Sequence, residues 1–69
     1  MFIKYVVKHY SQNRDIIYSA FAFDLWDNAI NSFNKLCAVE DYQKTHDIIS
    51  MYEFSYNDNE LLHIFSVEL

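Results

Sequence analysis

The 69-residue chain contains no glycine and no proline, so its turns have to be built from other residues. Asn, Asp and Ser suit turns because they tolerate left-handed backbone or hydrogen-bond to the nearby backbone. Such residues gather in two places, Ser11–Asp15 and Asn57–Glu60. Each cluster lies between two segments with strand character, so each predicts a hairpin loop.

Other absences bear on the location of the protein. A single cysteine rules out an internal disulfide bond. No stretch approaches the roughly 18 consecutive apolar residues that indicate a membrane-spanning helix. Lys8 and His9 interrupt the apolar start of the chain, which argues against a secretion signal. We therefore expect a cytoplasmic protein with no membrane contact.

Basic residues are scarce, with five Lys and Arg against ten Asp and Glu and a formal net charge of −5. Nucleic-acid-binding domains carry a basic stripe, so we expect no direct contact with DNA or RNA. Lys4, Lys8 and Arg14 lie among the first 22 residues with one acid, whereas the other nine acids lie in residues 23–69. This acidic part favours a basic partner, such as a nucleic-acid-binding groove. An ordinary solvated acidic surface is the alternative.

Aromatic residues are abundant at 19%, with six Tyr, six Phe and one Trp, and 52% of the chain is hydrophobic. This composition excludes intrinsic disorder, which requires low hydrophobicity and few aromatics. The length predicts one domain spanning residues 1–69. A chain of this size buries only about 60% of its unfolded surface, so association with a partner is one way to gain stability.

The hydrophobic pattern predicts four strands and one helix. The strands are expected at Phe2–Tyr10, Ile16–Phe23, Ile48–Tyr56 and Leu61–Val67. Between the second and third strands, a helix is expected over Leu25–Val39 with Asp24 as its N-cap, followed by a polar connection at 40–47. Its apolar stripe consists of Trp26, Ala29, Ile30, Phe33, Leu36 and Cys37.

This order, strand-strand-helix-strand-strand, predicts an α+β fold: a four-stranded, mostly antiparallel sheet with one helix on one face. One helix covers only one face of such a sheet. The third strand then leaves an apolar set uncovered, either Ile49 and Met51 or the set that contains Ile48, Tyr52, Phe54 and Tyr56. An exposed aromatic face is typical of an interface. The alternative is that the tyrosines lie flat on the surface with their hydroxyl groups in water.

No arrangement of residues predicts catalysis, a metal or a cofactor. The possible metal ligands Cys37, His9, His46, His63 and Asp47 lack the paired spacing of metal sites. Cys37 is expected late in the helix, where the dipole disfavours a thiolate, and no glycine-rich loop is present. The carboxylate pairs Glu40–Asp41, Asp24–Asp27 and Asp58–Glu60 fall at predicted helix ends and turns, where capping and solubility explain them. We therefore expect a protein that is not an enzyme.

The chain resembles the anti-CRISPR proteins, small inhibitors that phages and mobile elements encode. The resemblance rests on the first strand with Phe2-Ile3-Lys4-Tyr5-Val6-Val7-Lys8, the second strand ending in Ser19-Ala20-Phe21-Ala22, the helix with Ala29, Ile30 and Phe33, and the final hairpin. Some inhibitors of type I CRISPR surveillance complexes are similar in length and order of elements. The resemblance implies a protein that binds a CRISPR–Cas subunit.

Together these features predict a phage-type, anti-CRISPR-like inhibitor that binds a basic host nuclease or CRISPR–Cas subunit through an acidic and aromatic surface. The expected anchors and charge partners are Tyr52, Phe54, Tyr56 and Phe65 together with Glu53, Asp58 and Glu60. The alternative is a homodimeric structural or regulatory protein that pairs through its open sheet face or an edge strand.

Overall fold

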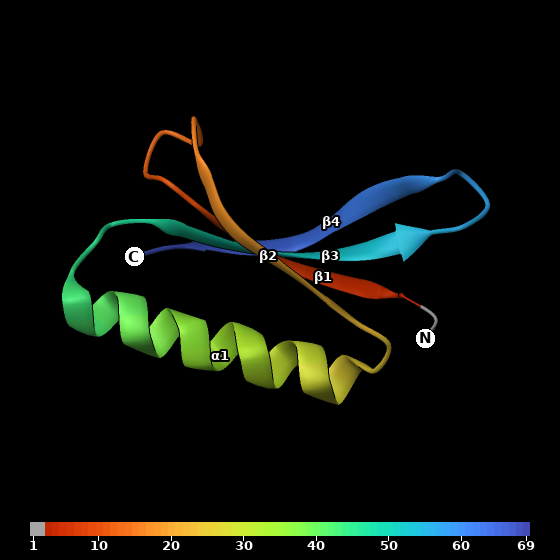
Figure 1. Ribbon diagram of the computed structural model, residues 1–69, viewed down its shortest axis with the longest axis horizontal. Helices are drawn as coiled ribbons and strands as arrows, with labels where there is room; N and C mark the ends of the chain where they lie inside the picture. Colours follow the sequence, from red (N-terminus) through yellow and green to blue (C-terminus); the bar gives the residue numbers. More distant parts are fainter. Residues whose placement is uncertain (1–2) are drawn as a thin grey trace.

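The computed structural model describes residues 3–69, which form a sheet with one helix packed against it (Figure 1). The elements follow the order β1 (Tyr5–Tyr10), β2 (Ile17–Phe23), α1 (Trp26–Gln43), β3 (Ile48–Ser55) and β4 (Glu60–Glu68). The four strands pair antiparallel in the order β2-β1-β3-β4. The predicted α+β fold and its order of elements are therefore confirmed. Phe2, the predicted start of the first strand, lies outside the described residues.

Polar side chains build both hairpin loops, as predicted. In the first loop the Ser11 hydroxyl donates to Asn13 Oδ1 over 3.0 Å and accepts the amide of Ile16 over 3.1 Å. Arg14 takes the left-handed conformation there with φ 65°. In the second loop Asn59 takes it with φ 53°. Non-glycine residues thus occupy both positions that would favour glycine in other chains.

The helix differs from its prediction at both ends. Its N-cap is Leu25, which makes no side-chain cap hydrogen bond, so Asp24 as the N-cap was wrong. The helix continues past Val39 to Gln43, because residues 40–43 contain good helix formers and no helix breaker. It ends where Lys44 turns left-handed with φ 56° and donates its amide to the Asp41 carbonyl.

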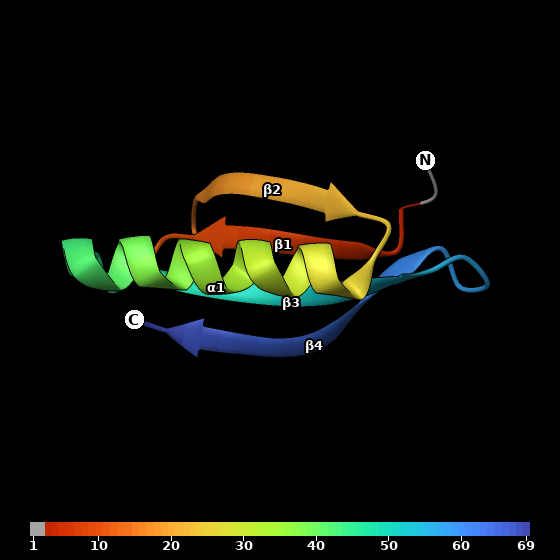
Figure 2. The same cartoon turned by 90° about the horizontal axis from the view of Figure 1, so that it is seen from below.

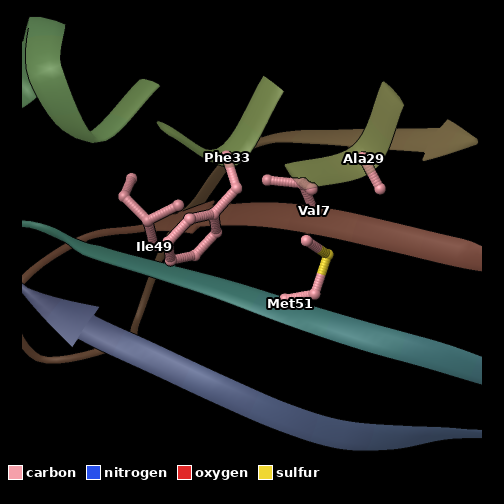
Figure 3. Packing of buried hydrophobic residues seen from close by; sticks show 5 residues of the cluster. All are labelled: Val7, Ala29, Phe33, Ile49 and Met51. Carbon is pink, nitrogen blue, oxygen red and sulfur yellow. The ribbon is translucent and has the colours of Figure 1, made fainter. Parts of the chain in front are cut away.

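The structure settles which sheet face the helix covers. α1 runs along the sheet over β1 and β3, with β2 and β4 on either side (Figure 2). Ala29 and Phe33 of α1 point at the sheet and pack with Val7, Ile49 and Met51 (Figure 3). Side chains opposite each other in an antiparallel pair share a face. Met51 faces the helix together with Val7. Tyr52 and Phe54 therefore lie on the uncovered side of β3.

This packing confirms the predicted apolar stripe of the helix except at Trp26. Ala29 and Phe33 are buried, and Ile30, Leu36 and Cys37 pack against the core from its margins. Trp26 is 39% exposed and covers the edge of the core, with its ring 5.4 Å from that of Tyr5. Within residues 3–69, no helix combines the length and apolar character needed to cross a membrane.

Candidate functional site

The sheet face opposite α1, the open face, is uncovered by any other element of residues 3–69 (Figure 1). The strand registers place alternate residues of all four strands on this face. Its side chains include those of Val6, Lys8 and Tyr10 on β1, Ala20 and Ala22 on β2, Ser50, Tyr52 and Phe54 on β3, and Leu61, His63 and Ser66 on β4. The registers also place Ile48 and Glu68 here, although Ile48, which was predicted to be uncovered, is buried. Polar side chains lie at the centre of the open face, and apolar side chains lie at the end near the β3–β4 turn.

The polar centre is held together by hydrogen bonds between neighbouring strands. The hydroxyl groups of Tyr10 and Tyr52 lie 2.9 Å apart, and Lys8 Nζ lies 5.2 Å from the centre of the Tyr52 ring. Burial, and then the hydrogen bond with Tyr52, raise the pKa of Tyr10 to about 12. Ser66 Oγ is hydrogen-bonded both to Ser50, over 2.7 Å, and to His63, over 2.6 Å. These bonds fix the tyrosine rings in place.

The apolar end of the open face forms a hollow of about 370 Å³. We call this hollow, lined by Ile3, Val6, Ala22, Phe54, Tyr56 and Leu61, the apolar hollow. The rings of Phe54 and Tyr56 meet edge to face at 4.5 Å, and the Tyr56 hydroxyl donates to the Ile3 carbonyl over 2.5 Å. Tyr56 is 50% exposed and Ile3 39% exposed. Among residues 3–69, no charged side chain lines the hollow, so an apolar group can enter it without displacing an ion's hydration.

An acidic loop lies beside the hollow, at the β3–β4 turn. Asp58 and Glu60 are exposed there, and we call these two residues the acidic tip. The Ser55 hydroxyl donates to Asp58 Oδ2 over 3.2 Å and accepts the Asp58 amide over 3.3 Å. The only ion pairs found within residues 3–69 are those of His9, so no lysine or arginine neutralises the tip. An apolar anchor site next to unpaired carboxylates suits a partner that presents both apolar and basic side chains.

The structure brings together five of the seven residues predicted to bind a partner. Tyr52 and Phe54 share the open face, Tyr56 adjoins Phe54, and Asp58 and Glu60 form the acidic tip.

The other two predicted residues lie on the opposite side of the sheet. Glu53 pairs with Tyr5 on the helix side, and Phe65 pairs with Met51 there. The ring of Phe65 packs edge to face on Phe33 at a centroid distance of 5.0 Å. Phe65 therefore lies at the margin of the core. Phe65 and Glu53 are not part of the candidate site on the open face.

Sequence reasoning missed the rest of the hollow, namely Ile3, Val6, Ala22 and Leu61. The sequence shows that apolar residues alternate along each segment. This alternation tells which residues share a side of one strand, but not which residues of different strands come together. The strand order β2-β1-β3-β4 brings them to Phe54, and this order is a long-range property that a local pattern does not give.

A second groove lies on the helix side, between α1 and β2, with a volume of about 640 Å³. Phe21, Phe23, Leu36 and Val39 supply its apolar lining, and Lys35 and three other polar helix residues supply the rest. It runs beside β2, whose outer edge has no neighbouring strand within residues 3–69. The groove and this edge form one continuous surface.

The single thiol is not part of either surface. Cys37 is partly buried against the core, and burial raises the pKa of its thiol. A raised pKa leaves less of the reactive thiolate at neutral pH.

The fold and its surfaces define a small two-layer α+β domain with one sheet face left open. Comparison with known proteins adds no relative: no protein-family model, no curated protein and no solved structure matches this chain. A function therefore has to be argued from the surfaces themselves.

Proposed function

We propose that this protein is an anti-CRISPR-like inhibitor of the phage type, which binds a subunit of a host type I CRISPR surveillance complex by protein–protein contact. The observation that carries the proposal is the apolar hollow on the open face, directly beside the acidic tip. Partly exposed Phe and Tyr rings are the residue types that anchor protein interfaces. The similarity in length and order of elements to such inhibitors points to this class of target.

The charge of the site supports a basic partner surface. Asp58 and Glu60 are exposed at a turn, on a chain with a net charge of −5. Subunits that hold nucleic acid present lysine and arginine side chains in a groove, and carboxylates on a docked protein pair with those side chains. The inhibitor then occupies the place of the nucleic acid without contacting nucleic acid itself.

Binding kinetics test the role of the acidic tip. We expect the double substitution Asp58→Lys and Glu60→Lys to slow association with an immobilised, purified type I surveillance complex by about tenfold at low salt, because the tip steers the encounter. The salt dependence of the association rate should also become weaker. Surface plasmon resonance at two salt concentrations measures both.

The matched control is Asp15→Lys with Asp41→Lys, which changes the net charge equally at two exposed positions at the other end of the sheet. A smaller effect of the control assigns the steering to the tip. Equal rates for both double variants would show that only the overall charge matters, and an unchanged tip variant would remove the electrostatic part of the proposal.

A second candidate function is self-association as a homodimeric structural or regulatory protein, and the edge strand β2 favours it. β2 contains no charged residue, and Ile17 and Tyr18 are each 55% exposed and Phe21 49% exposed. An edge strand without charged residues is suited to antiparallel pairing with a second copy of itself. The mass in solution tests this candidate.

A further inference from the structure

We propose that His9, Glu40 and Asp47 form a binding site for a divalent transition-metal ion, with Zn²⁺ as the best fit. The three residues come from β1, from α1 and from the loop that precedes β3. His9 Nε2 lies 2.9 Å from Asp47 Oδ2 and 3.8 Å from Glu40 Oε2. One ligand atom from each residue lies within 4.8 Å of the other two. Donor atoms from three separate segments of the chain therefore lie close together.

The charge of this cluster favours a cation. The side chains of His9, Glu40 and Asp47 are only 10%, 12% and 13% exposed, so water solvates the carboxylates poorly. No lysine or arginine among residues 3–69 forms an ion pair with either carboxylate. Even a protonated His9 neutralises one of the two negative charges, and the other remains in a poorly solvated place. Such charges are stable when they are paired or coordinate a metal.

The donor types and spacing indicate which cation fits. One imidazole nitrogen with two carboxylate oxygens suits zinc and its first-row neighbours better than Mg²⁺ or Ca²⁺, which prefer oxygen ligands alone. Bonds of roughly 2.0–2.1 Å in a tetrahedral zinc site place ligand atoms about 3.3 Å apart. The two distances from His9 Nε2, 2.9 and 3.8 Å, lie on either side of that value, and the two carboxylate oxygens lie within 4.8 Å of each other, so side-chain rotations bring all three atoms to one ion. A water molecule completes the tetrahedron.

The surrounding backbone holds the two carboxylates near His9. The Glu40 carbonyl accepts the Thr45 amide over 3.3 Å at the end of α1, and the Asp47 carbonyl accepts the Leu69 amide over 3.0 Å. The ring of Tyr18 lies 5.0 Å from the His9 ring. The site lies on the helix side, near the end of α1, while the acidic tip lies at the far end of β3 (Figure 1). It is independent of the proposed docking surface.

Calorimetric titration of Zn²⁺ into the full chain at neutral pH tests the proposal. We expect binding of one ion per chain, and at least tenfold weaker binding for Glu40→Gln and for Asp47→Asn. Glu40→Gln removes one of two neighbouring carboxylates, so this variant is expected to remain folded, which circular dichroism checks. Saturating Zn²⁺ should raise the Tm of the wild type by on the order of 10 °C and that of the variants much less.

Matched controls separate this site from adventitious binding. Asp41→Asn alters an exposed carboxylate next to Glu40, and His63→Ala removes an exposed histidine on the open face. Both should bind Zn²⁺ as the wild type does. Absence of binding to the wild type would overturn the proposal and identify the cluster as a buried ion pair. Binding that persists in Glu40→Gln and Asp47→Asn but is lost in His63→Ala would overturn it as well.

Discussion

At the scale of single residues, the tyrosines of this chain have different roles that their positions explain. Tyr42 is 89% exposed on the helix, whereas Tyr10 and Tyr52 share a hydrogen bond at the centre of the open face. Tyr56 is half exposed and lines the apolar hollow. Some tyrosine rings are therefore fixed by hydrogen bonds at the centre of the open face, and others are accessible at the hollow or on the helix.

The pKa of Tyr10, raised to about 12, makes stability depend on alkaline pH. The folded state holds the phenol neutral, while the unfolded chain ionises it near pH 10. The extra stability is fully present below pH 10 and is lost as pH rises from 10 to 12. Between pH 9 and pH 11 we expect the wild type to lose up to about 1 kcal/mol more stability than Tyr10→Phe, because Tyr10 is only partly buried.

Urea unfolding at pH 9 and pH 11 measures this difference. Tyr42→Phe is the control, since its hydroxyl is exposed, and it should behave as the wild type does. Identical losses for the wild type and Tyr10→Phe would contradict the assignment of a raised pKa to this hydroxyl group.

At the scale of secondary structure, the alternation of apolar residues and the turn residues predicted the strands, the loops and their order. The helix ends were less predictable. Asp24 has the chemistry of an N-cap, but the chain enters the helix one residue later, and Glu40 to Gln43 read as a connection because they are polar. Residues 40–43 continue the helix because they contain no helix breaker, and their polarity alone did not indicate this.

The candidate sites show the same limit more clearly. Tyr52, Phe54 and Tyr56 were predictable as one set because they follow each other at alternate positions. Val6, Ala22 and Leu61 join them only through the strand order, which the sequence left open. His9 lies 38 residues before Asp47 in the chain, so no local spacing predicted that His9 meets Glu40 and Asp47.

The edge strand β2 allows a direct test of self-association. If two copies pair along β2, we expect a concentration-dependent dimer for the wild type and a monomer for Ala20→Lys, because a lysine in the middle of an edge strand opposes pairing. Ala20 is exposed, so the substitution leaves the core intact. Light scattering coupled to size-exclusion chromatography measures the mass.

The control places the lysine on the other edge strand, as Ile64→Lys on β4, where Ile64 is 37% exposed. This variant should remain dimeric if β2 is the contact. A wild type that stays monomeric at every concentration would exclude the homodimer candidate.

At the scale of the whole molecule, the two proposed sites occupy opposite ends and opposite faces. The apolar hollow and acidic tip lie on the open face by the β3–β4 turn, while the His9 cluster lies under the end of α1. The sheet separates the two faces, and the core of Val7, Ala29, Phe33, Ile49 and Met51 lies on its helix side. A partner can therefore bind the open face without disturbing the packing between α1 and the sheet.

The most direct test of the proposed function is the cleavage of target DNA by a purified type I surveillance complex and its nuclease in the presence of this protein. We predict that cleavage falls as the protein is added, that Leu61→Asp in the apolar hollow abolishes the inhibition, and that Ile17→Asp on the exposed edge strand keeps it. Undiminished cleavage at a large excess of the folded wild-type protein would contradict the account.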